Sequence, residues 1–186
     1  MFVPAGFGQT RIWISRSSLS PLMRSTPSPS PSPGAAAFIR TIGLSTNDLI
    51  FNQATQRLYG SVSSIAGSTG NSVAEIDPVP GSITNQTFVG SEPTELGMSD
   101  DGETLYVGLD GAASIRRYNM VTHTAGAQFY VGNHNDNGPY AFTDIAVVPG
   151  NPSVIAVARR FRNFGGSAAG GVAIFENGIQ RTNTGP

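Results

Sequence analysis

The chain has 186 residues, a length that suits one domain with a sizeable core and a shorter appendage. Charged residues make up only 12% and the formal net charge is −1, which excludes a strongly basic surface for nucleic acid or for an anionic membrane. No cysteine is present, so a disulfide framework and a thiolate metal site are excluded as well. The many Gly and Pro residues (23 and 13) favour short strands joined by turns.

Residues 1–35 are predicted to be a disordered leader that ends in a Ser/Pro linker. The alternating run from Thr26 to Pro33 fixes φ at every other residue and removes backbone donors, which is typical of an extended spacer. Arg11, Arg16 and Arg24 interrupt the apolar stretches before it, so no signal-peptide core is visible. A targeting or anchoring role for this head is the alternative. No stretch of about 20 apolar residues predicts a transmembrane helix.

Residues 36–186 are predicted to form repeated units. The segment "LIFNQATQRLY" (Leu49 to Tyr59) aligns without a gap onto "LGMSDDGETLY" (Leu96 to Tyr106), a shift of 47 residues. The segment "IAVVPGNPSVIAV" (Ile145 to Val157) continues the series with one inserted residue. A period of 40–50 residues with about four strand-like runs per unit indicates the blades of a β-propeller.

The second unit shows how each blade divides into strands. Turn signals separate four predicted strands, which are Glu95–Ser99, Thr104–Leu109, Ala113–Asn119 and Ala125–Val131. Runs such as "TLYVGL" and "VIAVA" are almost continuously apolar, which indicates strands buried on both faces. A β-sandwich, the main rival, would alternate apolar and polar positions more cleanly. The predicted fold is therefore all-β: a partial β-propeller of about three four-stranded antiparallel blades, near residues 46–90, 93–132 and 140–186.

The second unit, "VGSEPTELGMSDDGETLYVGLDGAASIRRYNMVT", resembles the repeat of YVTN-type bacterial β-propellers. The resemblance extends over about residues 36–179 and is closest in this unit. It implies a propeller fold, and an extracytoplasmic or cell-surface location for a secreted protein. The family includes surface-layer and lactonase-like propellers, so membership implies no single chemistry.

Three blades are too few to close a ring, because closed propellers have 4–8 blades. An isolated arc would expose two apolar blade faces. The expected partners are therefore the remaining blades of a longer propeller, of which this chain would be a fragment, or further copies of the chain. The fragment hypothesis is favoured because the third unit stops at "GIQRTNTGP", where its outer strand should run. The strand-like segment 36–44 is expected to be the outer strand of a preceding blade.

Loop lengths predict which face binds a ligand. The loops Ser63–Asn71, Arg159–Gly171 and Asn133–Phe142 are long, and in an up-and-down blade they emerge on one face, here called the long-loop face. The ligand-binding candidates there are Arg159, Arg160, Phe161, Arg162, His134, Asp136, Tyr140 and Glu92. The ligand would be a small molecule or a protein.

Each candidate also has a purely structural interpretation. Arg159, Arg160 and Arg162 offer bidentate hydrogen bonds to a carboxylate or phosphate, and Phe161 offers ring stacking. Alternatively, Arg159 and Arg160 end their strand and pair with Glu or Asp of a neighbouring blade. His134 and Asp136 suit a general base, or a simple polar turn. Lactonase-like propellers hold a metal with carboxylates, for which only Glu92, Asp136 and Asp144 are available. Neither a catalytic residue nor a metal site nor a cofactor is predicted, and a non-catalytic scaffold or binding module is favoured over a lactonase-like hydrolase or lyase.

Overall fold

In the computed structural model, the described residues are 41–162 and 168–182. The predicted leader and linker lie outside them. Of the strand-like segment 36–44, residues 41–44 are described, and they form no strand. The amide of Leu44 instead donates to the carbonyl of Ile42 at 2.8 Å, a tight turn. Within the described ranges, no helix has the length and apolar character needed to cross a membrane.

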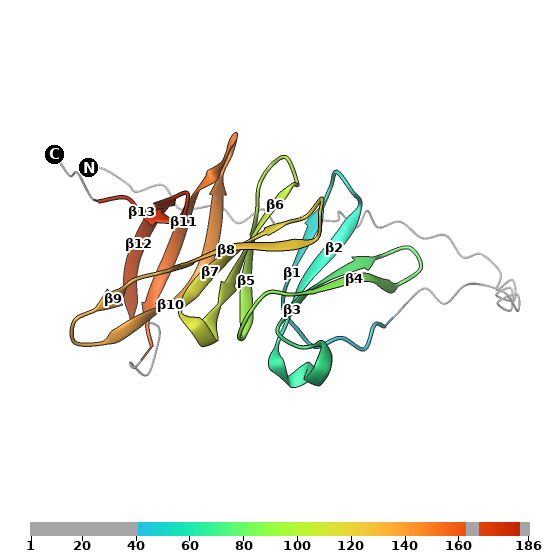
Figure 1. Cartoon of the computed structure of the whole chain (residues 1–186), viewed down its shortest axis with the longest axis horizontal. Coiled ribbons are helices and arrows are strands. Elements are labelled where there is room, and N and C mark those ends of the chain that lie inside the picture. The colour runs from blue at the N-terminus through green and yellow to red at the C-terminus, as the bar shows by residue number, and fades with distance from the viewer. Residues whose placement is uncertain (1–40, 163–167, 183–186) are drawn as a thin grey trace, which may run out of the picture. The chain divides into compact units, whose positions relative to one another are not determined.

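The strands form three separate antiparallel sheets in chain order (Figure 1), which we call blades 1, 2 and 3. Blade 1 contains β1 (Thr46–Asn52), β2 (Arg57–Val62), β3 (Ser72–Asp77) and β4 (Ser82–Phe88). Blade 2 contains β5 (Pro93–Met98), β6 (Thr104–Leu109), β7 (Ser114–Asn119) and β8 (Thr124–Tyr130). Blade 3 contains β10 (Gly138–Val148), β11 (Asn151–Phe161), β12 (Ala169–Glu176) and β13 (Ile179–Gln180), with β9 (Asn133–His134) added beside β10. Two 3-10 turns, η1 (Ser64–Thr69) and η2 (Asp110–Ala112), join the second and third strands of blades 1 and 2.

The sequence repeat reappears as a repeat of strand register. Ile50 pairs with Tyr59 in blade 1, and Gly97 pairs with Tyr106 in blade 2, so the gapless alignment also aligns the pairing. In blade 3, Ile145 pairs with Val157. The all-β fold with three antiparallel four-stranded blades is therefore confirmed.

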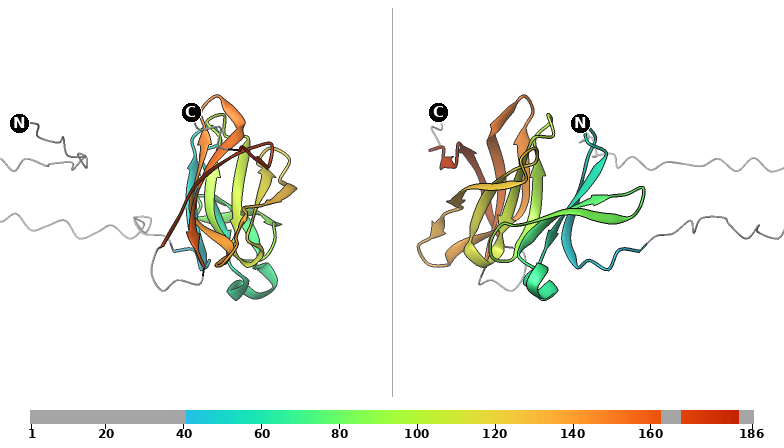
Figure 2. Two further views of the ribbon diagram at one scale, coloured as in Figure 1. Left: turned by 90° about the vertical axis from the view of Figure 1, so that its left-hand side faces the viewer. Right: turned by 45° about the vertical axis from the view of Figure 1, so that its right-hand side comes forward.

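The three sheets lie side by side, with β1, β5 and β10 adjacent (Figures 1 and 2). We call these three the inner strands. They are not hydrogen-bonded into one sheet, and polar side chains link blade 1 to β5 instead. Asn47 Nδ2 donates to the carbonyl of Pro93 at 2.7 Å, and Asp48 Oδ2 accepts from the amide of Leu96 at 2.8 Å. Ser61 Oγ donates to the carbonyl of Thr94 at 2.6 Å. Side-chain bonds therefore fix how blade 2 sits on blade 1.

Two apolar cores lie between successive blades. The first core contains Tyr59 and Val73 of blade 1 with Leu96, Leu105 and Tyr118 of blade 2. The second core is formed by Tyr106 and Ile115 of blade 2 and Phe142, Ile155, Val157 and Phe175 of blade 3. All six residues of β6 are buried, because blade 2 has a neighbour on each side. This burial explains the nearly unbroken apolar run of that strand.

Three local expectations were wrong. Residues 159–161 belong to β11 and residues 169–171 to β12, so the loop expected between Arg159 and Gly171 is shorter. The loop expected at 133–142 is mostly the β9–β10 hairpin, in which Gly138 pairs with His134. An outer strand of blade 3 does exist: β13 pairs with β12 through Ile179 opposite Glu176. Short pairings of two residues leave almost no periodic signal in a sequence.

Candidate functional site

The connections η1, η2 and the β9–β10 hairpin gather at one end of the sheets (Figure 1), as expected for the long-loop face. The opposite end carries the tight turns between the first and second strands of each blade. In one of these turns, Gly102 has a φ of 71° and lies against Asn52 of blade 1. A side chain at Gly102 would meet Asn52 Oδ1 at 2.8 Å, so the short-loop end is closely packed.

Four of the eight candidate residues come together on blade 3. The His134 ring lies edge-on to Phe161 at 5.0 Å, and Tyr140 stacks at a tilt on Phe161 at 5.6 Å. Arg159 Cζ lies 4.2 Å from the centre of the Tyr140 ring, a cation–π contact. His134 Nδ1 faces its own turn, 3.0 Å from Asn137 Nδ2. The cluster therefore fastens the β9–β10 hairpin to β11.

The other two arginines diverge from this cluster. Arg162 reaches blade 2, where it donates to the Asp110 carbonyl and lies 3.1 Å from Asp110 Oδ1. This ion pair joins blades 3 and 2 through Arg162, whereas the interblade pairs were expected for Arg159 and Arg160. Arg160 follows Arg159 in β11, and successive side chains of a strand point to opposite faces. Both arginines border a groove of about 220 Å³, which Ala158 and Val172 also line.

Glu92 and Asp136 lie apart from each other on the long-loop face. Glu92 has a φ of 49° and links blades: its amide donates to Asn71 Oδ1 at 2.9 Å, and its carbonyl accepts from the Asp110 amide at 2.8 Å. Asp136 is exposed in the β9–β10 turn, where its amide faces His134 Nδ1 at 3.3 Å. The backbone of Glu92 therefore links blades 1 and 2, and the backbone of Asp136 stabilises the β9–β10 turn.

A pocket that sequence reasoning largely missed lies where the three inner strands run side by side. We call it the axial pocket. It has a volume of about 470 Å³ and is lined by two residues from each of β1, β5 and β10: Asn47, Asp48, Thr94, Glu95, Thr143 and Asp144. These are equivalent positions, because Asp48, Glu95 and Asp144 each directly precede the aligned residues Leu49, Leu96 and Ile145. One carboxylate per blade therefore borders the same space.

The three carboxylates differ in their hydrogen bonds. Asp48 accepts two backbone bonds, from Leu49 N at 2.7 Å and Leu96 N at 2.8 Å. Asp144 Oδ1 accepts from Ile145 N at 2.9 Å, the same local bond. Glu95 Oε2 is buried and accepts no hydrogen bond from the described residues. Buried carboxylate oxygens almost always accept a hydrogen bond, so we expect water or a ligand to donate one to Glu95 Oε2.

A sequence signal for this pocket existed. The shift of 47 residues that aligns Leu49 with Leu96 also aligns Asp48 with Glu95, one position earlier than the aligned segments begin. Of the three carboxylates, only Asp144 was recognised as a candidate ligand. Among residues 41–162 and 168–182, no three His, Asp or Glu side chains converge closely enough to hold a metal ion.

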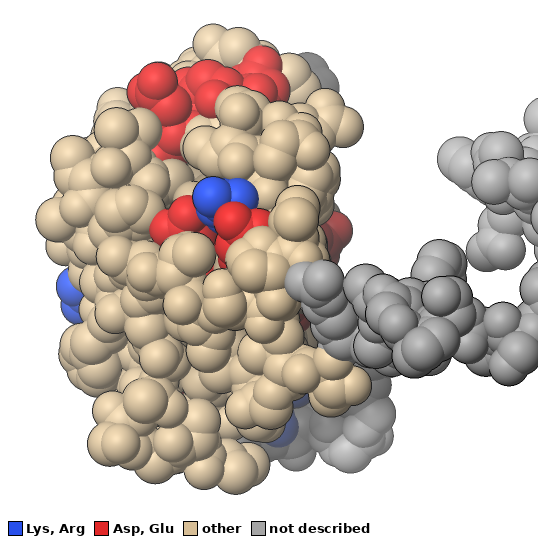
Figure 3. Space-filling view, turned by 90° about the vertical axis from the view of Figure 1, so that its right-hand side faces the viewer, with Lys and Arg blue, Asp and Glu red and all other residues tan. Residues whose placement is uncertain are grey.

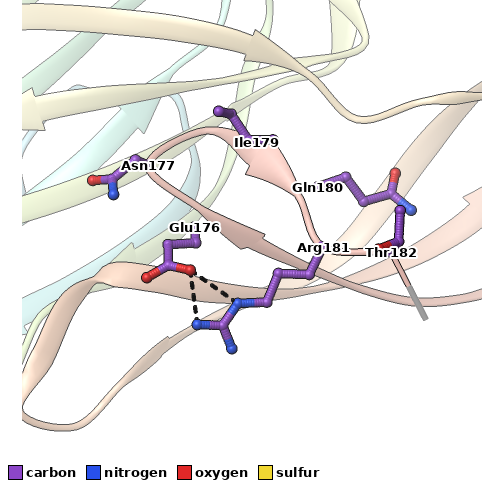
Figure 4. A pocket seen from close by; sticks show the side chains of 6 residues that line it. All are labelled: Glu176, Asn177, Ile179, Gln180, Arg181 and Thr182. Atoms are coloured by element: carbon purple, nitrogen blue, oxygen red, sulfur yellow. Dashed lines mark hydrogen bonds and ion pairs between the residues drawn. The ribbon is translucent and has the colours of Figure 1, made fainter. Parts of the chain in front are cut away.

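A second hollow lies beside the β12–β13 turn (Figure 4). Its most prominent contact is an ion pair within the hairpin, in which Arg181 Nη2 and Nε lie 2.9 and 3.1 Å from Glu176 Oε2. Both side chains are about half exposed, so this pair contributes little to stability. The hollow is an open surface feature formed by a single turn.

The comparisons with solved structures agree with this architecture. The chain is similar to hydrazine synthase of Kuenenia stuttgartiensis, with a TM-score of 0.58, 15% identity and coverage of 79% of this chain and 37% of that one. It is also similar to the WD40 repeats of RRP9, with a TM-score of 0.55, 13% identity and coverage of 77% and 39%. For the β-propeller domain of Cps50 (Swd1) from Myceliophteria thermophila, the values are 0.54, 14%, 77% and 39%.

The fold is a partial β-propeller. The chain spans about two fifths of the length of these structures. At such low identity the likeness shows the fold alone. No family model matches the sequence, and no curated protein matches it.

Proposed function

We propose that this chain is a non-catalytic β-propeller binding module, and that the axial pocket between its inner strands receives a group rich in hydrogen-bond donors. The main support for this proposal is that Glu95 Oε2 is buried without a hydrogen-bond partner among the described residues, in a pocket that Asp48 and Asp144 also border. Carboxylates and hydroxyls accept hydrogen bonds, so they select an ammonium or guanidinium group rather than an anion. A Lys or Arg side chain of a partner protein has this chemistry.

The aromatic and arginine cluster on blade 3 is a poorer candidate for the ligand site. Arg159 stacks on Tyr140 and Arg162 pairs with Asp110, so both cations are already engaged within the protein. Binding an anion there would require these contacts to be broken. We therefore place the ligand site at the axial pocket, and assign the cluster to positioning the β9–β10 hairpin on the long-loop face.

The resemblance to YVTN-type repeats supports two further proposals. The first is that the module belongs to a secreted or surface protein, located outside the cytoplasm. The second is that the intact propeller contains more than the three blades described here. The second proposal is consistent with the chain spanning about two fifths of the solved propellers.

The binding proposal is tested by titrating labelled pentalysine into the full chain and following fluorescence anisotropy. We expect saturable binding that is weakened at least about tenfold by Glu95→Gln, because one charge-assisted hydrogen bond is worth about 1.5–3 kcal/mol. Glu103→Gln, on the exposed short-loop end, is the matched control and should bind like the wild type. Equal affinity of wild type and Glu95→Gln would refute the pocket assignment.

The same preparation distinguishes a binding module from a lactonase-like enzyme. A screen of lactone substrates with and without chelator should show no turnover, and metal analysis should find no stoichiometric ion. Chelator-sensitive hydrolysis together with bound metal would replace the binding function with a hydrolase.

A further inference from the structure

The two ends of the three-blade arc expose positions that are buried elsewhere in the same chain. Leu49 on blade 1 is 50% exposed, whereas its equivalent on blade 2, Leu96, is 6% exposed in the first core. Phe51 and Ile83, on the same outer face of blade 1, are 41% and 40% exposed. Figure 3 looks onto this side, and most of its surface carries no charge.

The free face of blade 3 shows the complementary half of the interface. Val172 occupies the register position of Ile115 in blade 2, because Val172 pairs with Ala158 as Ile115 pairs with Gly108. Ile115 is fully buried against blade 3, but Val172 is 64% exposed. No further blade covers this face, so two residues of the apolar run "IAVV" (145–148), Ala146 and Val148, are also exposed to solvent.

The two free faces are the two halves of one kind of interface. In each interface within the chain, the sheet face that one blade turns toward the next blade packs on the face that the next blade turns back toward it. On blade 3 the first kind of face is free, and on blade 1 the second kind is free. The same chain therefore carries both faces of one more interface. Between blades 2 and 3, Gly97 lies against Ile145, and a side chain at Gly97 would meet Ile145 Cγ2 at 2.8 Å. Between blades 1 and 2, the equivalent residues are Ile50 and Leu96, so this position also accommodates a side chain. On the free faces the equivalent residues are Ala146 and Leu49.

We propose that a second copy of the chain closes the propeller, with blade 3 of each copy packed on blade 1 of the other. Two copies give six blades, within the 4–8 of closed rings, whereas three copies would exceed that range. The arrangement has a twofold axis along the propeller, so residue i of one copy meets residue j of the other and the reverse. Closure buries Leu49 and Val172 and brings two sets of axial carboxylates around one channel. This proposal is independent of the ligand proposed for the axial pocket.

The cysteine-free chain allows a direct cross-linking test. A Cβ at Gly97 would lie 3.1 Å from Ile145 Cβ, which is closer than the roughly 3.5–4.5 Å across a disulfide, so a bridge at the equivalent pair needs only a small separation of the strands. The equivalent pair across the proposed interface is Ala146 of one copy and Leu49 of the other. Purified Ala146→Cys/Leu49→Cys should therefore oxidise to a covalent dimer on a non-reducing gel. Ala146→Cys/Val121→Cys is the matched control, because Val121 is 65% exposed in a turn outside the end faces.

The single variants determine the orientation. Ala146→Cys alone and Leu49→Cys alone should remain monomeric on the gel, and an oxidised mixture of the two should give the heterodimer. Efficient self-linking of either single variant would show that like faces meet, and would overturn head-to-tail closure. Equal cross-linking in the Val121 control would overturn it as well.

Sedimentation equilibrium of the unmodified chain gives an independent measurement. The proposal predicts twice the 19.4 kDa mass of one chain at micromolar concentration, and loss of the dimer in Val172→Arg but not in Val121→Arg. A monomeric wild type would overturn the proposal, since the free faces would then belong to another occupant. Open-ended oligomers would overturn the closed ring. The cross-linking result decides the matter should Val172→Arg fail to fold.

Discussion

At the scale of single residues, polar side chains define the turns and link the blades. Asn52 is fully buried; its Nδ2 donates to the Gly102 carbonyl of blade 2 at 2.8 Å, and its Oδ1 accepts from the amides of Ala54 and Thr55. Asn119 makes the same kind of turn in blade 2 but is exposed. Asn52 therefore stabilises both its own turn and the contact between blades 1 and 2, whereas the contacts given for Asn119 stabilise its turn alone.

Asn52→Ala should lower the free energy of unfolding by about 1–3 kcal/mol more than Asn119→Ala, because buried groups would lose their partners without access to water. Urea denaturation of both variants and the wild type measures the difference. Equal losses would show that Asn52 acts only as a turn residue and does not fasten blade 1 to blade 2.

Asp101 provides a pH-dependent contact. The Ser99 hydroxyl, 2.5 Å from Oδ1, and the Glu103 amide at 2.9 Å hold the pKa of Asp101 below its ordinary value. Because the folded-state pKa is depressed, this contribution to stability is complete above the ordinary carboxyl pKa of about 3.9. It is lost as the pH falls through the lower, folded-state pKa.

A carbon-detected NMR titration of the Asp101 carboxyl measures this pKa directly. We expect a midpoint below that of an unstructured peptide, and a shift back toward the ordinary value in Ser99→Ala. A midpoint at or above the ordinary value in the wild type would contradict the hydrogen-bond assignment.

At the scale of strands and turns, the sequence predicted best where both faces of a strand are buried. The expected strand Thr104–Leu109 agrees with β6 at both ends, since its apolar run is continuous and Gly102 and Asp110 bound it. The β9–β10 hairpin was missed because its polar Asn and Gly residues resemble a loop, while backbone pairing and the rings of His134 and Tyr140 hold it. Such long-range contacts have no local signature.

Gly108 tests how closely β6 approaches blade 3. A Cβ at this position would overlap the Phe142 ring, so Gly108→Ala should destabilise the protein by about 1–3 kcal/mol through overpacking. Gly43→Ala is the control, because a Cβ there meets nothing within 4 Å. Thermal and urea unfolding measure both variants.

Phe142→Leu provides the second half of this test. It should reduce the cost of Gly108→Ala, because the smaller side chain yields space, and a double-mutant cycle reports that coupling. Additive losses would place Phe142 away from Gly108 and contradict the packing of blade 3 on β6.

At the scale of the whole described unit, periodicity predicted the blades and their number, but not the composition of the site. The 47-residue shift identifies equivalent residues, and equivalent residues in a propeller converge on one axis. The axial pocket required that geometric step, since Asp48, Glu95 and Asp144 are far apart in the sequence. The arginine segment was the more conspicuous sequence feature, yet Arg159 and Arg162 are engaged by Tyr140 and Asp110.

The central claim is that successive repeats stack as blades, with their inner strands side by side and not hydrogen-bonded into one sheet. Nuclear Overhauser contacts in a methyl-labelled sample test it most directly. The structure predicts strong contacts between the Ile145 methyl groups and the α-protons of Gly97, where β10 lies close against β5. A regular antiparallel ladder of contacts joining β4 to β5, as in one continuous sheet, would contradict it.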